Sequence, residues 1–383
     1  MGQVSAKSGS AKAGSTLLSG LGFHFPAKSS TKPAKQLCIG LRAAERVGVA
    51  QVSFIPRKHT LTQAKGAPLL GAGSNQPKAT REEVLSTEVV HANVAKPAGV
   101  LLLFHGCQHS AIDWWPAQPS CPSCIGLPEE VRITKAAAAH NLVAVALSSR
   151  DRLAHRCWDA TWPVEQCTEI QQVGKVIKQL LERESWNQLP LYALGVSSGG
   201  AMALLLASHM PLQGVCSQVM AIPPAWLGLK SRDTRGHPHP PTIFMHMPEN
   251  DPMTGQGVAQ DLKALQSAGV KTREMRIQPQ PVTGTFLSDR IDGLDAATSA
   301  AIVEALTGAG LLDSAGFLFK DPRQTSKKWH KVLREQVPAT RQMNLNHDES
   351  PIHEELNIAW AGHECISDHI ADVFKFFHHK SGR

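Results

Sequence analysis

The segment Leu189-Pro-Leu-Tyr-Ala-Leu-Gly-Val-Ser-Ser-Gly-Gly-Ala-Met-Ala-Leu-Leu-Leu-Ala207 decides which fold this chain can adopt. Residues 189–194 form a short and mostly apolar run, which is typical of a buried strand. Residues 200–207 are strong helix formers. Between them stands Gly195-Val196-Ser197-Ser198-Gly199, a Gly-x-Ser-x-Gly motif in the strand–turn–helix context that exposes a serine hydroxyl. The segment predicts Ser197 as a nucleophile and the N–H of Ser198 as a donor toward a developing oxyanion.

Strands and helices alternate around this segment from about residue 81 onward. Strands are expected at 88–92, 99–104, 142–147, 214–222, 242–247 and 272–277, and helices at 131–140, 170–181 and 260–268. This alternation indicates a mostly parallel central sheet with helices on both faces. A short apolar stretch at 356–360 is expected to be a late strand, followed by a last helix from about residue 366.

Residues 281–356 break this rhythm. Helical patterns at 295–311 and 326–333 stand among long irregular stretches. Segments of this length are usually lids, insertions or extra subdomains. We interpret 281–356 as an insertion or lid within a domain of residues 81–383, and we hypothesise that it influences substrate specificity.

A nucleophilic serine needs a base, and the base needs an orienting acid. His363 follows the expected late strand and precedes the last helix, so it is the predicted base, with His369 as a rival. Asp251 lies in the loop that leaves the strand 242–247, at the strand end where parallel sheets bind ligands. Asp251 is the predicted acid, and Glu249 in the same loop stays open as an alternative.

A second oxyanion donor is expected from the loop after the strand 99–104. This loop reads His105-Gly106-Cys107-Gln108, and Gly106 allows the backbone to approach a substrate closely. The N–H of Cys107 or Gln108 is the expected donor. His105 is expected to form structural hydrogen bonds if the loop is only a turn.

Aromatic and cysteine residues gather in the loops around the predicted site. The tryptophans could line a substrate pocket or form a small core of the loops themselves; they are Trp114, Trp115, Trp158 and Trp162. The cysteines could form disulfides, bind zinc or stay reduced, and the lack of a second Cys-x-x-Cys pair disfavours zinc; they are Cys121, Cys124, Cys157 and Cys167. No metal or cofactor is expected.

Charge is distributed unevenly along the chain. The net charge is +7, but residues 1–80 hold eleven lysines and arginines and only one acidic residue, so the remainder has a slight acidic excess. We expect residues 1–80 to be a disordered tail or an organelle transit peptide, which leaves a chloroplast, mitochondrial or cytoplasmic location open. No basic stripe is interleaved with aromatic residues, so nucleic-acid binding is not expected. No run of 18 apolar residues suggests a membrane span.

Three passages resemble the polyhydroxybutyrate-depolymerase and feruloyl-esterase group of α/β-hydrolases. Leu103–Gln108 is similar to that group's oxyanion segment, and 156–162 to its Cys-Trp loop. Residues 194–202 are similar to its nucleophile segment, Gly-x-Ser-Ala-Gly-Gly-Ala-Met. The resemblance covers about residues 95–260 and implies an α/β-hydrolase fold and ester hydrolysis. His246 is followed by Met247 where His-Gly is common, and 281–356 has no counterpart in the group.

Together these patterns predict hydrolysis of a small-molecule or polymer ester by Ser197, His363 and Asp251. An acyltransferase or a peptidase could use the same three residues, because the nucleophile does not choose the acceptor. A binding protein on a hydrolase scaffold is the alternative from another class. The sequence leaves the oligomeric state open.

Overall fold

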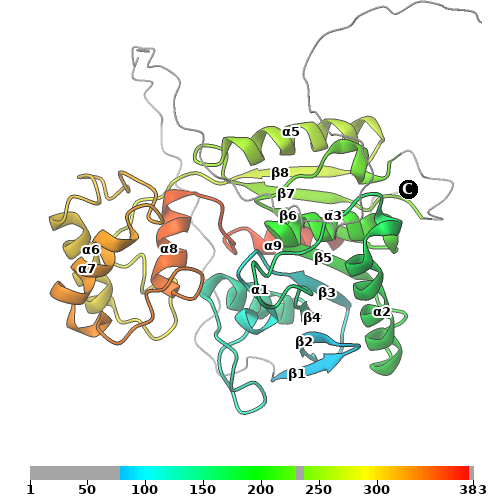
Figure 1. Cartoon of the computed structure of the whole chain (residues 1–383), viewed down its shortest axis with the longest axis horizontal. Helices are drawn as coiled ribbons and strands as arrows, with labels where there is room; N and C mark the ends of the chain where they lie inside the picture. The colour runs from blue at the N-terminus through cyan, green and yellow to red at the C-terminus, as the bar shows by residue number, and fades with distance from the viewer. Residues whose placement is uncertain (1–77, 230–236, 379–383) are drawn as a thin grey trace, which may run out of the picture. The chain divides into compact units, whose positions relative to one another are not determined.

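The computed structural model describes residues 78–229 and 237–378 (Figure 1). The basic segment expected at 1–80 therefore lies outside the described residues, apart from its last three. An eight-stranded sheet has the order β1-β2-β4-β3-β5-β6-β7-β8. The strands are β1 (Ala79–Val84), β2 (Thr87–Ala92), β3 (Gly99–Phe104), β4 (Leu142–Leu147), β5 (Leu191–Val196), β6 (Gly214–Gln218), β7 (Thr242–His246) and β8 (Thr272–Arg276).

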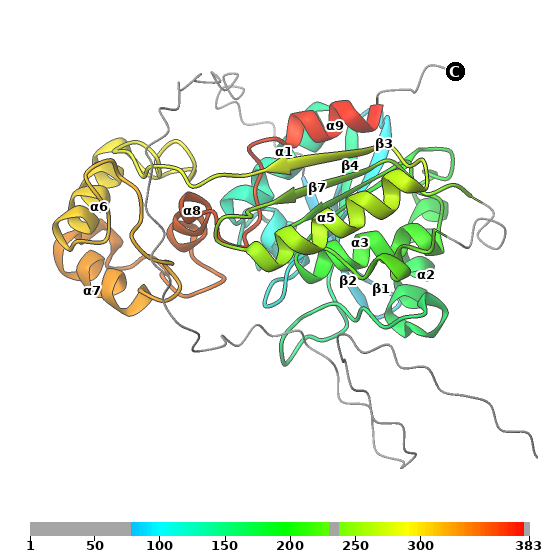
Figure 2. The same cartoon turned by 90° about the horizontal axis from the view of Figure 1, so that it is seen from above.

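Helices cover both faces of this sheet. In Figure 2, α1 (Pro128–Ala139) and α9 (Ile370–His378) lie on one face, and α2 (Thr168–Arg183), α3 (Ser198–His209) and α5 (Pro252–Ser267) lie on the other. The strand residues alternate accordingly: Leu102 and Phe104 pack in the apolar cluster with α2 and α3, whereas Leu101 and Leu103 pack in the cluster with α1 and α9. In the described ranges, no helix is long and apolar enough to cross a membrane.

The directions of the strands bring the carboxyl ends of the parallel strands to one edge of the sheet. β1 and β2 are antiparallel to each other, β2 is antiparallel to β4, and every pair from β4 through β3 to β8 is parallel. The parallel strands therefore end at the same edge, where β5 turns sharply at Ser197 into α3. A mostly parallel sheet with helices on both faces and this strand–turn–helix junction is the α/β-hydrolase fold, as the sequence predicts.

Several element boundaries differ from those expected, among them the start of α5 and the end of β6. Helix α5 begins at Pro252 rather than near residue 260, because Asp251 caps it: its carboxylate accepts the N–H of Thr254 at 3.3 Å. Gly255 and Gly257 are poor helix formers and obscured these first turns. Strand β6 ends at Gln218 instead of continuing to residue 222.

The late strand expected at 356–360 is wrong, because these residues belong to helix α8 (Pro351–Trp360). The Ser350 side chain caps this helix by accepting the N–H of His353, and Pro351 occupies the first turn, where its missing N–H costs nothing. Residues 352–359 are all buried, including the polar side chains of His353, Glu354 and Asn357, so polarity in this segment does not mark a solvent-facing side of a helix. His363 consequently follows a helix.

Residues between β8 and α9 build a third apolar cluster of their own. It extends from Val282 to Ala359 and is centred on Trp329 and Leu333, which are fully buried. The cluster draws on α6 (Ala296–Gly308), α7 (Ser326–Gln336) and α8, which Figure 1 shows in yellow to orange. This segment has a core separate from the two clusters that flank the sheet.

Buried charges join this helical segment to the sheet. Arg290 contacts Glu129 of α1 at 3.0 Å, Asp368 at 2.8 Å, and Glu355 of α8. Beside this network, the carboxyl groups of Glu130 on α1 and Glu354 on α8 are both buried and interact electrostatically with each other. Burial raises the pKa of Glu130 to about 7, and burial together with the Glu130 charge raises the pKa of Glu354. One proton shared by the pair relieves the cost of burying two carboxylates.

Replacing Glu354 with glutamine is expected to stabilise the protein at pH 8 and to have little effect at pH 5. A carboxyl group with a raised folded-state pKa contributes its full stability below its unfolded pKa near 4.5, and loses it as pH rises through the raised folded-state pKa. Glutamine has no proton to lose, so the stability of the variant relative to wild type should grow as pH rises from 5 to 8. The measurement is the free energy of unfolding in urea at several pH values from 5 to 8.

The difference between variant and wild type isolates this pair from other titrating groups nearby, among them His109, Asp113 and Glu364. Glu304→Gln, an exposed position on α6, is the matched control and should leave the profile unchanged. A Glu354→Gln variant that shifts stability equally at pH 5 and pH 8 would contradict the shared proton.

Candidate active site

The turn at Ser197 is sharp and strained. Ser197 has φ of 52° and ψ of −121°, which a non-glycine residue adopts only where its surroundings impose it. A Cβ at Gly195 would lie 1.9 Å from the carbonyl oxygen of Gly199, and one at Gly199 would lie 2.2 Å from that of Phe104. Both glycines of the motif are therefore required so that β5 and α3 can approach each other and the end of β3.

Ser197, His363 and Asp251 form a continuous chain of hydrogen bonds. The Ser197 Oγ lies 2.8 Å from His363 Nε2, and His363 Nδ1 lies 2.6 Å from Asp251 Oδ2. The Asp251 side chain is 7% exposed and that of His363 is 31% exposed, so the acid is buried while the imidazole can be reached from solvent. The three residues come from the ends of β5, β7 and α8, far apart in the sequence.

Asp251 is held in its ionised form. Burial alone would raise its pKa, but the hydrogen bonds from His363 and Thr254 outweigh burial and lower the pKa of Asp251 below its usual range. The alternative acid Glu249 and the alternative base His369 are both exposed, unlike Asp251. The His369 carbonyl accepts N–H groups in the first turn of α9. Of the two candidate acids, Asp251 is the one that contacts His363.

The loop after β3 lies directly against the nucleophile turn. A Cβ at Gly106 would lie 3.6 Å from Ser197 Cβ, so the backbone of this loop is adjacent to the Ser197 side chain. Within residues 78–229 and 237–378, no hydrogen bond uses the N–H of Ser198 or of Cys107. The N–H of Gln108 instead donates to the carbonyl of His155 at 2.8 Å, which corrects its expected role as an oxyanion donor. Two backbone donors, on Ser198 and Cys107, remain beside Ser197.

The segment 151–158 supports this loop from behind. A disulfide joins Cys107 to Cys157, and the Trp158 Nε1–H donates to the carbonyl of His105 at 3.0 Å. The segment is ordered by Asp151, whose carboxylate accepts the backbone N–H groups of residues 153–156. These contacts fix the position of the Cys107 N–H.

His105 is structural, as the sequence allowed. Its Nδ1 lies 2.6 Å from the carbonyl oxygen of Gly106, and its Nε2 accepts the N–H of Ser149 at 3.0 Å. Burial lowers the pKa of His105 to about 3, so the imidazole is neutral and donates from Nδ1.

Of the four tryptophans that could line a substrate pocket or form a core of the loops, three lie in the apolar clusters. Trp114 and Trp115 are fully buried in the cluster beneath α1, and Trp158 is buried with its ring edge-on to Phe104 at 5.2 Å. Their surfaces are already covered, which favours a core role over a pocket role, the two alternatives that the sequence left open. Trp162 is half-buried and stacks on Trp226 at 6.3 Å, so part of its surface stays accessible.

The cysteine pattern resolves into two disulfides. Cys121 pairs with Cys124, and Cys157 pairs with Cys107, a residue that the sequence did not mark for pairing. Cys167 is buried as a thiol, and burial raises its pKa. The part of the chain that the structure describes has no cluster of three metal-ligating side chains.

Two residues beside the site escaped the sequence analysis because no motif marks them. His109 also faces Gly106: its Cδ2 would lie 3.6 Å from a Cβ there. Burial would lower its pKa, but the hydrogen bond and charge of Asp113 outweigh burial and raise the pKa of His109 to about 10. Arg323, from the helical segment, donates to the carbonyl oxygens of Gly362 and His363.

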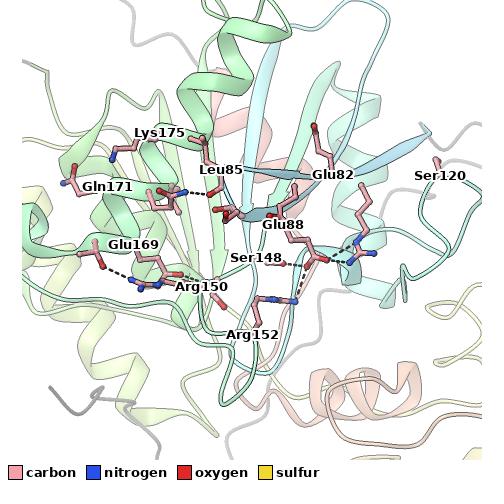
Figure 3. Close-up of a pocket in the computed structure, with 18 of the residues that line it drawn as sticks. Glu82, Leu85, Glu88, Ser120, Ser148, Arg150, Arg152, Glu169, Gln171 and Lys175 are labelled. Carbon is pink, nitrogen blue, oxygen red and sulfur yellow. Dashed lines mark hydrogen bonds and ion pairs between the residues drawn. The ribbon is translucent and has the colours of Figure 1, made fainter. Parts of the chain in front are cut away.

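One cavity lies away from Ser197. It holds about 1180 Å³ between the β1–β2 turn, the loop after β4 and α2, and its lining includes none of the three hydrogen-bonded site residues (Figure 3). Among its charged groups, Glu88 contacts both Arg81 at 2.7 Å and Arg152 at 3.1 Å, and it accepts the Ser148 hydroxyl at 2.6 Å. Figure 3 shows Ser148 and Arg152 pointing toward Glu88. The cavity therefore lies apart from the hydrogen-bonded residues of the site.

Comparisons with known proteins find likenesses in structure alone. No protein-family model matches the chain, and no curated protein matches its sequence. A dienelactone hydrolase from Anabaena variabilis is 16% identical over 54% of this chain and 88% of its own, with a TM-score of 0.36. A carboxyl esterase from Bacillus coagulans is 11% identical over 52% and 89%, with a TM-score of 0.37. An esterase/lipase from an uncultured bacterium is 13% identical over 58% and 81%, with a TM-score of 0.36.

Proposed function

We propose that this chain is a serine hydrolase that cleaves carboxylic esters through an acyl-enzyme. The observation that carries the proposal is the hydrogen-bonded chain from Asp251 through His363 to Ser197, with distances of 2.6 and 2.8 Å. A serine hydroxyl is a weak nucleophile near neutral pH and gains reactivity from a base that an acid holds in place. The carboxyl edge of the parallel sheet is where such folds bind ligands.

The first half-reaction forms the acyl-enzyme. The Ser197 Oγ attacks the ester carbonyl while His363 Nε2 takes its proton, and the ionised Asp251 stabilises the resulting imidazolium through Nδ1–H. The N–H groups of Ser198 and Cys107 face the oxygen on which negative charge develops. One such donor contributes about 3 kcal/mol to the transition state. His363 then returns the proton to the departing alcohol, and Ser197 keeps the acyl group.

The second half-reaction releases the acid. His363 Nε2 removes a proton from water, the water oxygen attacks the acyl carbonyl, and the same two N–H groups hold the second oxyanion. Ser197 leaves with the proton that His363 carried, which restores the starting state. The 31% exposure of the His363 side chain is consistent with entry of water to this side of the imidazole.

A fluorophosphonate probe tests this proposal without knowledge of the natural ester, because it reacts only with an activated serine. We expect the full chain to gain one adduct on the peptide that contains Ser197, as measured by mass spectrometry. Ser197→Ala should not react. Ser198→Ala is the matched control: it removes the neighbouring hydroxyl but keeps its backbone N–H, so it should still be labelled.

Absence of labelling in folded wild-type protein would contradict the proposal and favour a binding protein on a hydrolase scaffold. Labelling of Ser197→Ala to the wild-type extent would contradict the assignment of the nucleophile.

A further inference from the structure

The loop that carries His363 has an unusual backbone. Ala361 and His363 both have positive φ angles, 53° and 40°, a conformation that side-chain-bearing residues rarely adopt. No strand ladder supports the loop, since α8 ends at Trp360 and α9 begins only at Ile370. Its geometry must therefore be held by contacts from elsewhere.

Arg323 supplies such contacts from the segment between α6 and α7. Its Nη1 donates to the carbonyl oxygen of Gly362 at 2.6 Å, and its Nη2 donates to that of His363 at 2.9 Å. The two nitrogens of one planar guanidinium thus fix two successive carbonyl groups at once, a geometry that a lysine ammonium cannot reproduce. A buried carbonyl oxygen needs such a partner.

Glu364 completes the arrangement from the loop itself. Its Oε2 accepts from Arg323 Nη2 at 2.9 Å and from Asn357 Nδ2 of α8 at 2.8 Å. The same carboxylate group accepts the backbone N–H of Cys365 through Oε1 at 3.1 Å. The charge and hydrogen bonds of Glu364 therefore fix the guanidinium in the orientation in which it donates to the carbonyl oxygens of the loop.

The backbone around Arg323 is also held in place. Its own N–H donates to Asp321 Oδ1 at 2.8 Å, and the fully buried Trp329 donates from Nε1 to the carbonyl of Pro322 at 2.9 Å. Arg323 is therefore a short link between the core of the helical segment and the His363 loop.

We propose that Arg323 is a positioning residue that holds His363 in line with Ser197 and Asp251. This inference rests on the proposed hydrolase function, and it gives the helical segment a role in the reaction. Arg323 touches no reacting atom and acts only through the backbone of the loop. Displacement of a reacting group by about 1 Å is enough to slow a reaction roughly 100-fold.

The test measures hydrolysis of p-nitrophenyl acetate and the rate of fluorophosphonate labelling in full-length variants. Arg323→Ala is expected to lower kcat and the labelling rate about 100-fold with little change in KM, because the base is misplaced while the ester-binding surface is kept. Arg323→Lys should recover only part of the loss. Millimolar guanidinium ion, far below denaturing concentrations, should partly restore Arg323→Ala and leave wild type unaffected.

Arg334→Ala is the matched control. Arg334 also donates to backbone carbonyls, those of Thr340 at 2.5 Å and Met343 at 2.8 Å, but it lies inside the helical segment and does not contact the His363 loop. Its removal should lower stability and leave the labelling rate of the folded protein at the wild-type value.

The outcomes separate the two proposals. Unlabelled wild-type protein would overturn the hydrolase function itself. The two proteins are compared at equal folded fractions, as measured by circular dichroism. If wild type is labelled and Arg323→Ala is labelled at the same rate, the positioning role alone is overturned. Equal losses in Arg323→Ala and Arg334→Ala, or no rescue by guanidinium, would show general loosening of the segment and would also overturn it.

Discussion

Replacing His363 with alanine is expected to lower kcat for p-nitrophenyl acetate about 10⁶-fold, nearly to the level of the Ser197→Ala variant. The two residues act as one unit in the proposed reaction, since His363 is the one base that contacts the Ser197 hydroxyl, at 2.8 Å from Nε2, among residues 78–229 and 237–378. The residual rate comes from substrate binding and the backbone oxyanion donors, which both variants keep. Steady-state kinetics at pH 8 measure the loss.

His369→Ala is the control for a nearby imidazole on the same loop-to-helix connection. Its side chain is exposed, and its carbonyl still caps α9 in the variant, so kcat should stay at the wild-type value. A loss in His369→Ala as large as that in His363→Ala would show that the proposed base is wrong.

The elements around the nucleophile could be predicted because their signals are local. Gly195 and Gly199 are required by close contacts within the β5–α3 junction and with its neighbour β3. Both glycines are part of the Gly-x-Ser-x-Gly motif, so the sequence pattern indicates this requirement. The strands β3 and β4 agree with the expected 99–104 and 142–147 because a buried parallel strand is a short apolar run between breakers. The mostly parallel sheet followed from these runs.

Features that depend on distant partners could not be predicted in the same way. Helix α8 looked like a strand because its partners bury every side, and Gln108 looked like a donor because its acceptor, His155, lies 47 positions further along the chain. For Trp114 and Trp115 the sequence left a pocket and a loop core open, because a loop position does not reveal what covers it. Arg323 and the Glu130–Glu354 pair join segments that no sequence spacing relates.

Replacing Asp251 with asparagine is expected to lower kcat about 10⁴-fold while the fold stays intact. Asparagine is as good a helix N-cap as aspartate, so the hydrogen bond to the Thr254 N–H that starts α5 can be kept. Its amide, however, cannot stabilise an imidazolium, and when its NH₂ faces Nδ1 it holds the wrong tautomer of His363. The variant therefore separates the charge of Asp251 from its structural role, and kcat together with the melting temperature measures the two.

Glu249→Gln provides the comparison that discriminates between the two carboxylates of this loop. Glu249 is exposed two residues before Asp251, and the same loss of one negative charge there should leave kcat within about twofold of wild type, because solvent screens an exposed charge. If Glu249→Gln lost activity and Asp251→Asn did not, the acid would be Glu249, and the 2.6 Å contact between Asp251 and His363 would be structural. The expected order follows from burial: a carboxylate orients an imidazole strongly only where water does not compete for it.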